Sequence, residues 1–203
     1  MQRRTRRFVA FALMAGVCLV LVLRAVFGSG HATADSPPGT VLTPPASVLG
    51  DRSEVAARRA AIDYLELTEK APALGPKGAY DAQRAVSTSR AGGAMAGEVE
   101  SVLTDLLAKY PALKIRVAPI LLRSVGDGDG WRISVWYVET LTLGDVVVDD
   151  WRTVTYVLRW ERERWLIDAR TSTRGPVPAR SAALAATPPA QFEAALAGFT
   201  DGW

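Results

Sequence analysis

Few residues of this chain combine a reactive side chain with an informative position, and Glu139 is the first of them. Glu139 shares the odd-numbered positions of an alternating segment with Val135, Tyr137 and Leu141. Side chains two residues apart lie on one face of a strand, so we expect Glu139 to point into the core. A buried carboxyl group has a raised pKa and can act as a general base, with Tyr64 or Tyr137 supplying a hydroxyl group.

A structural interpretation of Glu139 competes with this catalytic one, and we prefer it. The strand can bulge near Glu139, or the inward carboxylate can pair with an arginine. Asp168 alternates with apolar neighbours, so we expect it to face solvent or the partner strand. The acids Asp145, Asp149 and Asp150 lack the spacing of a calcium loop and are expected to form a solvated turn.

The residues that bind metals are scarce. The chain has one cysteine, Cys18, and one histidine, His31. This excludes an internal disulfide framework, a cysteine zinc site and a histidine-rich metal site, and it makes a Ser-His-Asp triad a poor explanation. The Gly126–Gly130 segment (GDGDG) is expected to be a turn and not a phosphate loop, because no suitable helix follows it. The sequence therefore predicts no metal and no cofactor.

Tryptophan is concentrated in the second half of the chain, and one of these residues suggests an interface. Trp136 lies on the opposite face of its strand from Val135 and Tyr137. Together with Val138 it predicts an exposed apolar patch of the kind that marks protein interfaces. Coverage of Trp136 by the C-terminal segment explains the pattern equally well.

The N-terminal region predicts a membrane anchor. Phe8–Leu23 is uninterrupted by charge, and the segment through Phe27 has the length of a helix of about 30 Å, the thickness of a bilayer core. Arg24 lies near one end, where its guanidinium group can reach the interface. The large apolar side chains of this anchor are Phe8, Phe11, Leu13, Leu19, Leu21 and Leu23.

The flanking charges predict the topology. Arg3, Arg4, Arg6 and Arg7 precede the apolar run and keep the N-terminus in the cytoplasm, which places everything after Gly28 outside. A cleaved signal peptide is the alternative, because residues 32–34 (ATA) resemble a cleavage site. The apolar run is longer than a signal-peptide core, which favours a retained anchor. No cysteine follows it, so a lipid-anchored form is excluded.

The charge balance argues against nucleic-acid binding by the rest of the chain. Five of the 24 lysines and arginines precede residue 35, which leaves 19 bases against 21 acids from Asp35 onward. The basic character thus belongs to the N-terminus, and no basic stripe follows. Arginine far outnumbers lysine and alanine is abundant, a composition typical of a high-GC, actinobacterial genome.

Changes in residue pattern divide the chain into segments. Residues 28–50 are rich in proline and glycine and are expected to form an extended stalk. Helical spacing then predicts helices, the first capped by Ser53, and period-two alternation predicts four antiparallel strands, the last two joined by a tight hairpin at residues 161–164. Helices followed by strands indicate an α+β fold.

The expected segments are a cytoplasmic tail (1–7), a transmembrane helix (8–27), a stalk (28–50), the α+β domain (51–178) and a tail with a short helix (179–203). The expected helices are Ser53–Lys70, Tyr80–Ser89, Ala94–Lys109 and Pro189–Phe199, with a break around Pro72, Gly75, Pro76 and Gly78.

Two segments carry a family resemblance. Val55–Leu67 (VAARRAAIDYLEL) and the tryptophan-bracketed hairpin Val157–Ala169 (VLRWERERWLIDA) follow a basic N-terminus, one apolar span and a proline-rich stalk. This layout resembles the cystatin-like fold of nuclear transport factor two and its relatives, over about Ser53–Pro178. Within that superfamily it looks most like the bitopic VirB-type scaffold subunit of type IV secretion systems and its Gram-positive conjugation counterparts.

The resemblance implies a four-stranded antiparallel sheet covered by N-terminal helices, and a non-enzymatic scaffold on the outer face of the cytoplasmic membrane. Its expected partners are other membrane subunits of a conjugation or secretion machine and further copies of itself, with no direct contact to nucleic acid. The superfamily also holds isomerases and small-ligand binders, some of which use a carboxylate base and a tyrosine donor. If this chain were such an enzyme, Glu139, Tyr64 and Tyr137 would be its candidate residues.

Overall fold

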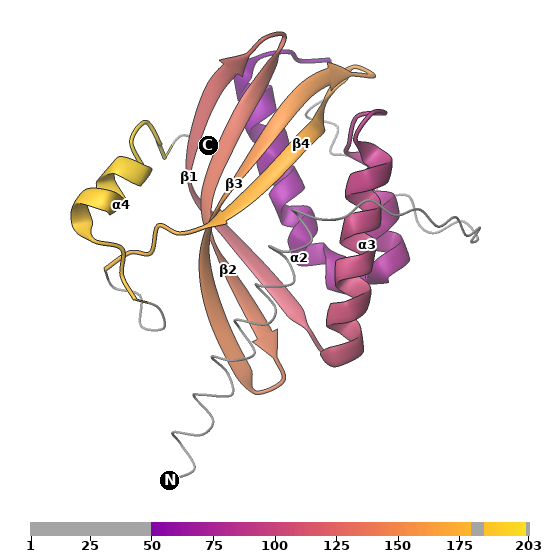
Figure 1. Ribbon diagram of the computed structural model, residues 1–203. Helices are drawn as coiled ribbons and strands as arrows, with labels where there is room; N and C mark the ends of the chain where they lie inside the picture. Colours follow the sequence, from indigo (N-terminus) through magenta and orange to yellow (C-terminus); the bar gives the residue numbers. More distant parts are fainter. Residues whose placement is uncertain (1–49, 180–184, 202–203) are drawn as a thin grey trace. The chain divides into compact units, whose positions relative to one another are not determined.

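The computed structural model describes residues 50–179 and 185–201. Two helices are followed by four strands and a short C-terminal helix (Figure 1). Their bounds are α2 (Glu54–Ala85), α3 (Gly92–Lys109), β1 (Lys114–Asp127), β2 (Gly130–Leu143), β3 (Val146–Glu161), β4 (Arg164–Arg174) and α4 (Pro189–Ala195). The α+β class is therefore confirmed.

Helix α2 begins and bends where its sequence requires it. The Ser53 side chain accepts a hydrogen bond from the Ala56 N–H at 3.1 Å, which caps the first turn. The helix contains Pro72 and Pro76, and between them Gly75 takes a left-handed conformation with φ 69°. The predicted break is thus confirmed, but it is confined to one residue. The expected helix Tyr80–Ser89 is the second arm of α2, which ends at Ala85 and not at Ser89.

The sheet is an antiparallel meander in the order β1-β2-β3-β4. Two-residue turns join its strands, and glycine supplies the positive φ in the first two, at Gly128 and Gly144. The third turn uses Arg162 and Glu163, both with positive φ, as a tight hairpin. Four strands were predicted and four are found, each longer than its most regular alternating stretch.

Helices α2 and α3 lie on one side of the sheet and α4 lies on the other (Figure 1). The inner, helix-facing side of the sheet supplies most of the core. Small residues of α2 permit close approach to it, and larger side chains fill the interface. The core includes Ala57, Ala60, Ala61 and Leu65 from α2, with Leu122, Ile133, Val135, Val154, Tyr156, Leu158 and Ile167 from the strands.

Two further boundary predictions are wrong. The acids at positions 149 and 150 do not lie in a turn: β3 begins at Val146, so Asp149 and Asp150 are strand residues, and only Asp145 occupies the turn. Helix α4 ends at Ala195 and not at Phe199. The segment after it instead returns to the sheet, where Thr200 pairs with Leu122.

The expected anchor and its flanks lie outside the described residues. These are the arginines at 3, 4, 6 and 7, the apolar segment Phe8–Phe27, Cys18, His31 and most of the stalk. Within residues 50–179 and 185–201, no helix is both long and apolar enough to span a membrane.

Candidate functional site

Glu139 lies in unbroken register on the inner face of β2. It pairs with Val117 of β1 and Asp150 of β3. No bulge occurs at Glu139, and the irregularity in β1 lies between Pro119 and Leu121. Burial and the nearby Asp150 charge raise the pKa of the Glu139 carboxyl, against the attraction of Arg152 and Arg170. The inward orientation predicted for Glu139 is therefore confirmed. The arginines expected near it are Arg152 and Arg170.

The neighbouring charges on this face are already engaged with one another. Asp150 is buried, and its carboxylate accepts from Arg152 Nη1 at 2.9 Å and lies 3.4 Å from Arg174 Nε. Arg152 Nε also donates to the Ser172 hydroxyl at 3.1 Å. Asp150, expected in a solvated turn, is thus the centre of a buried ion-pair cluster. The cross-strand arginines explain the difference, since they neutralise a carboxylate that burial alone would exclude.

The three residues proposed for catalysis are not brought together. Tyr137 is buried on the same face as Glu139, two positions away, and burial and the Glu139 charge raise its pKa. The Tyr64 hydroxyl instead donates to the Trp165 carbonyl oxygen. The strand register places Trp165 at the end of the sheet that holds the β1–β2 turn, near Trp131. Glu139 lies eight residues further along β2 than Trp131, which is a distance of about 26 Å along the strand. A site that uses Tyr64 with Glu139 is therefore wrong.

The outer face of the sheet is covered where an exposed patch was predicted. Trp136 is only 5% exposed. Its indole N–H donates to the Pro176 carbonyl at 3.0 Å, and its ring stacks on Trp151 and meets Phe192 edge-on. The prediction of a free interface at Trp136 is therefore wrong, and the alternative of coverage by the C-terminal segment is confirmed. Val138, beside it, remains partly exposed.

The C-terminal segment continues from this face to the edge of β1. Thr200 and Leu122 exchange two backbone hydrogen bonds of 2.7 and 2.8 Å. The Thr200 hydroxyl also accepts from Arg58 of α2 at 3.1 Å. The segment expected as a separate tail thus packs against the outer face and closes part of an edge strand.

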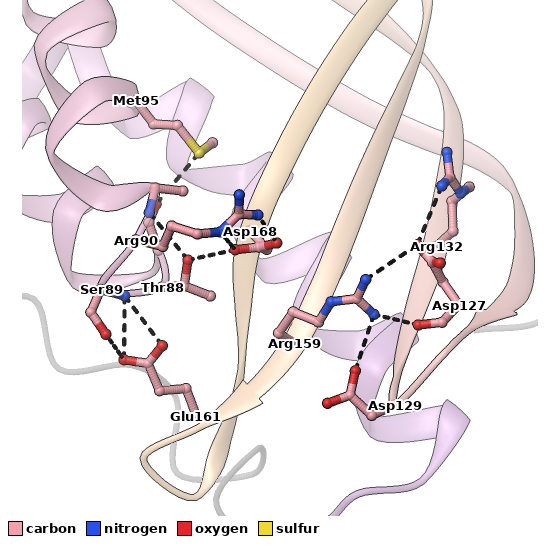
Figure 2. A network of polar contacts seen from close by, with 12 residues as sticks. Thr88, Ser89, Arg90, Met95, Asp127, Asp129, Arg132, Arg159, Glu161 and Asp168 are labelled. Atoms are coloured by element: carbon pink, nitrogen blue, oxygen red, sulfur yellow. Dashed lines mark hydrogen bonds and ion pairs between the residues drawn. The ribbon is translucent and has the colours of Figure 1, made fainter.

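A polar network fastens the loop between α2 and α3 to the other edge of the sheet (Figure 2). Asp168 accepts from the Thr88 hydroxyl at 2.9 Å and from the Arg90 guanidinium group, which lowers its pKa. The Thr88 N–H donates to the Ile167 carbonyl, and the Ile167 N–H donates to Val86. Asp168 therefore faces neither open solvent nor the partner strand: its side chain is largely covered by this loop.

The GDGDG segment is a turn, as predicted, and an arginine closes over it. Arg159 of β3 donates to the Asp127 carbonyl oxygen and lies 3.4 Å from the Asp129 carboxylate, as Figure 2 shows. Arg132 also reaches the Asp127 carboxylate, at 3.2 Å. The polar groups of the turn are therefore already bonded to arginines of the same sheet, which supports a structural role for the GDGDG segment.

The opposite end of the sheet carries exposed apolar side chains that the sequence analysis missed. The β2–β3 hairpin turns at Gly144 and Asp145, and Val146 and Val147 after it are 46% and 64% exposed. The run of three valines between acids (DVVVDD) is the signal that could have found it. Its low polarity fits a core strand, and only the register shows that β4 ends before it reaches these valines.

No metal centre accompanies these features. Among the residues that the structure describes, no group of three or more histidine, cysteine or acidic side chains could hold a metal ion. The fold is compatible with the cystatin-like layout that the sequence resembles. No protein-family model matches the chain, and no curated protein matches it.

Proposed function

We propose that this chain is a membrane-anchored, non-enzymatic assembly subunit of the cystatin-like type, with its domain on the outer face of the cytoplasmic membrane. The sequence supports the anchor, through Phe8–Phe27 and the four arginines before it. The described domain supports an interaction role. The observation that carries it is the apolar β2–β3 hairpin tip, which protrudes while the sheet's inner face and Trp136 are covered.

The place where the chain enters the domain fits this role. The Gly50 N–H donates to the Glu163 carbonyl at 2.9 Å, so the first described residue of the chain lies at the β3–β4 turn. The β2–β3 hairpin lies at the other end of β3, a strand of 16 residues and about 50 Å. The exposed valines are therefore presented at the end of the sheet opposite Gly50. By the resemblance of the layout, the machine served is a conjugative type IV secretion-like apparatus.

Cross-linking of the full-length protein in its host membrane, followed by mass spectrometry, tests this function. We expect cross-links to a translocation ATPase, to a polytopic membrane subunit or between copies of the chain. A mature chain that begins at Asp35, is released into the medium and forms no cross-links would overturn the proposal. An Arg3/Arg4/Arg6/Arg7→Glu variant is the matched control, because it removes the charges that set the topology.

One observation favours a second candidate, an extracytoplasmic ligand binder or isomerase-like enzyme. The Glu139 carboxyl, with its raised pKa, lies two residues from the buried Tyr137 on the inner sheet face. Its arginine neighbours Arg152 and Arg170 fit an anionic ligand or a structural cluster. Loss of a measured ligand affinity in Glu139→Gln, with membrane cross-links unchanged, would favour this candidate over the assembly subunit.

A further inference from the structure

The β2–β3 hairpin tip has a strand edge that no other described part of the chain covers. The pairing of β3 with β4 ends at Arg152 and Arg174, and the chain then turns away at Gly175. The outer edge of β3 from Val146 to Asp150 therefore has no strand beside it within the described residues. This edge coincides with Val147, which is 64% exposed and is the most exposed valine of the sheet, and with Val146, which is 46% exposed.

The register shows which backbone groups point outward along this edge. In a hairpin with a two-residue turn, the flanking pair Leu143 and Val146 exchanges both backbone hydrogen bonds, and bonded pairs then recur at every second residue. Val147 and Asp149 consequently direct their N–H and C=O groups away from β2. The same alternation places the Trp151 carbonyl on that side, where it accepts from the Gly175 N–H.

Parts of the two outer strands of the sheet are protected in ways that this edge is not. On β1, Leu122 pairs with Thr200, the Val117 N–H donates to the Glu69 carboxylate at 3.1 Å, and Pro119 has no N–H. On β4, Ile167 is bonded on both sides by the α2–α3 loop. Such devices are how proteins prevent unwanted strand pairing. The edge at Val146 and Val147 has no backbone partner, side-chain acceptor or proline of this kind within the described residues, so it is suited to accept a strand.

The charges around the edge restrict the occupant. Residues 141–150 contain the acids Asp145, Asp149 and Asp150 and no lysine or arginine. Asp150 is paired with Arg152, whereas Asp145 and Asp149 are exposed. A strand with basic residues complements this edge, and an acidic strand is repelled by it.

A second copy of the same edge is a poor occupant. Antiparallel pairing of Val147 with its own copy sets Asp149 opposite Asp145, and pairing of Asp149 with itself also opposes like charges. The remaining register pairs Val147 with Asp149 of the copy, which sets Asp145 of the copy opposite Trp151. The Trp151 carbonyl is already bonded to the Gly175 N–H, so the turn of the copy would collide with Gly175. A foreign basic strand meets none of these obstacles.

We propose that the free edge Val146–Asp150 binds an extended basic segment of a partner protein by β-strand addition, with a lysine or arginine of that segment beside Asp149. This deepens the proposed assembly function and rests on it. The backbone groups of Val147 and Asp149 supply the hydrogen bonds, and the valine side chains supply apolar contacts on both faces of the added strand.

The test uses the full chain in phosphatidylcholine nanodiscs and two fluorescein-labelled, capped hexapeptides, one alternating lysine with valine and one alternating glutamate with valine. We expect fluorescence anisotropy to detect the lysine peptide and to show at least roughly tenfold weaker binding of the glutamate peptide. Empty nanodiscs give the background. A higher salt concentration should weaken the binding of the lysine peptide, because salt screens the exposed charges of Asp145 and Asp149.

Val147→Pro is the decisive variant. It removes an outward N–H while leaving the bonds of β3 to β2 intact, so the domain should fold and peptide binding should fall at least roughly tenfold. Val55→Thr, at a valine that is 73% exposed on α2, is the matched control and should bind as the parent chain does. Circular dichroism checks the fold of both variants.

Three results would overturn this inference. One is equal binding of the two peptides, another is unchanged binding to Val147→Pro, and the third is concentration-dependent self-association that Val147→Pro abolishes, which would make a second copy the occupant. If Val147→Pro keeps every membrane cross-link of the parent chain while the peptide fails to bind, the strand-addition proposal falls and the assembly function stands.

Discussion

The two ends of the sheet are built on opposite principles. At the end where Gly50 meets the β3–β4 turn, Arg159 closes over the β1–β2 turn and the α2–α3 loop is bonded to β4 (Figure 2). At the other end, the β2–β3 hairpin extends past β4 with exposed valines and an open strand edge. The difference indicates that one end holds the domain together and the other is left free for contacts, as expected when stability and binding are assigned to separate regions.

The glycines of the two turns should show the largest difference. A Cβ atom at Gly130 would lie 2.1 Å from the Leu158 carbonyl oxygen and 2.7 Å from Arg159 Nη1. At Gly144 a Cβ atom would meet nothing within 4 Å, and only its φ of 63° opposes a side chain. We expect Gly130→Ala to lower the free energy of unfolding by about 3 kcal/mol or more, and Gly144→Ala by about 1 kcal/mol.

Urea denaturation of the full chain in a mild nonionic detergent, followed by tryptophan fluorescence, measures both values. The two variants control for each other, because each adds one methyl group in or directly beside a hairpin turn of the same sheet. Equal losses would show that the close approach of Gly130 to β3 does not distinguish the two ends.

Asp168 should give the next effect. Asp168→Ala leaves the buried Thr88 hydroxyl without its acceptor and releases Arg90, at an expected cost of about 1–3 kcal/mol. Arg90 is 77% exposed, so the Thr88 bond supplies most of this loss. Asp149→Ala, which removes an acceptor of the Thr140 hydroxyl at the free end, should stay within about 0.5 kcal/mol.

The pH dependence of this effect has a definite sign. Arg90 and Thr88 hold the pKa of Asp168 below its ordinary value, so the ionised carboxylate is favoured in the folded state. Its contribution is present above the pKa of an ordinary aspartate and is lost as the pH falls through the lowered value. The difference between the parent chain and Asp168→Ala should therefore shrink in acid. A difference independent of pH would contradict the charged role of Asp168.

The architecture could be predicted from the sequence because local periodicity encodes it. The period-two alternation predicted four antiparallel strands and an inward-facing Glu139. Ser53 predicted the helix cap, and Gly75 was among the residues that predicted the break. These features depend on neighbours within a few residues. The same is true of the GDGDG turn, whose type follows from its own glycines.

The features that were missed depend on register and on distant segments. Asp150 looks solvated in the sequence, and only pairing with β4 brings Arg174 beside it. For Trp136 the sequence left exposure and coverage by the C-terminal segment equally open, and only the return of Pro176 and Phe192 decides for coverage. The valines after Gly144 look like core residues, and only the short length of β4 leaves them exposed. Each of these three positions needed knowledge of where another segment ends.

Glu139 should give the smallest effect, and it lies between the two ends. Burial raises the pKa of its carboxyl group, so the unfolded chain gives up the proton at lower pH than the folded one. The folded state is consequently penalised as the pH rises from the ordinary glutamate pKa through the raised value, and the penalty is complete above it. Glu139→Gln removes this penalty, and we expect the free energy of unfolding to rise by up to about 1 kcal/mol at neutral pH and to match the parent chain in acid.

Glu161→Gln is the matched control, because the Ser89 hydroxyl lowers the pKa of Glu161, so the same substitution should destabilise at neutral pH. Urea denaturation at both pH values decides the matter. If Glu139→Gln destabilises at neutral pH, the attraction of Arg152 and Arg170 outweighs burial, and the inner face belongs to the stabilising end of the sheet.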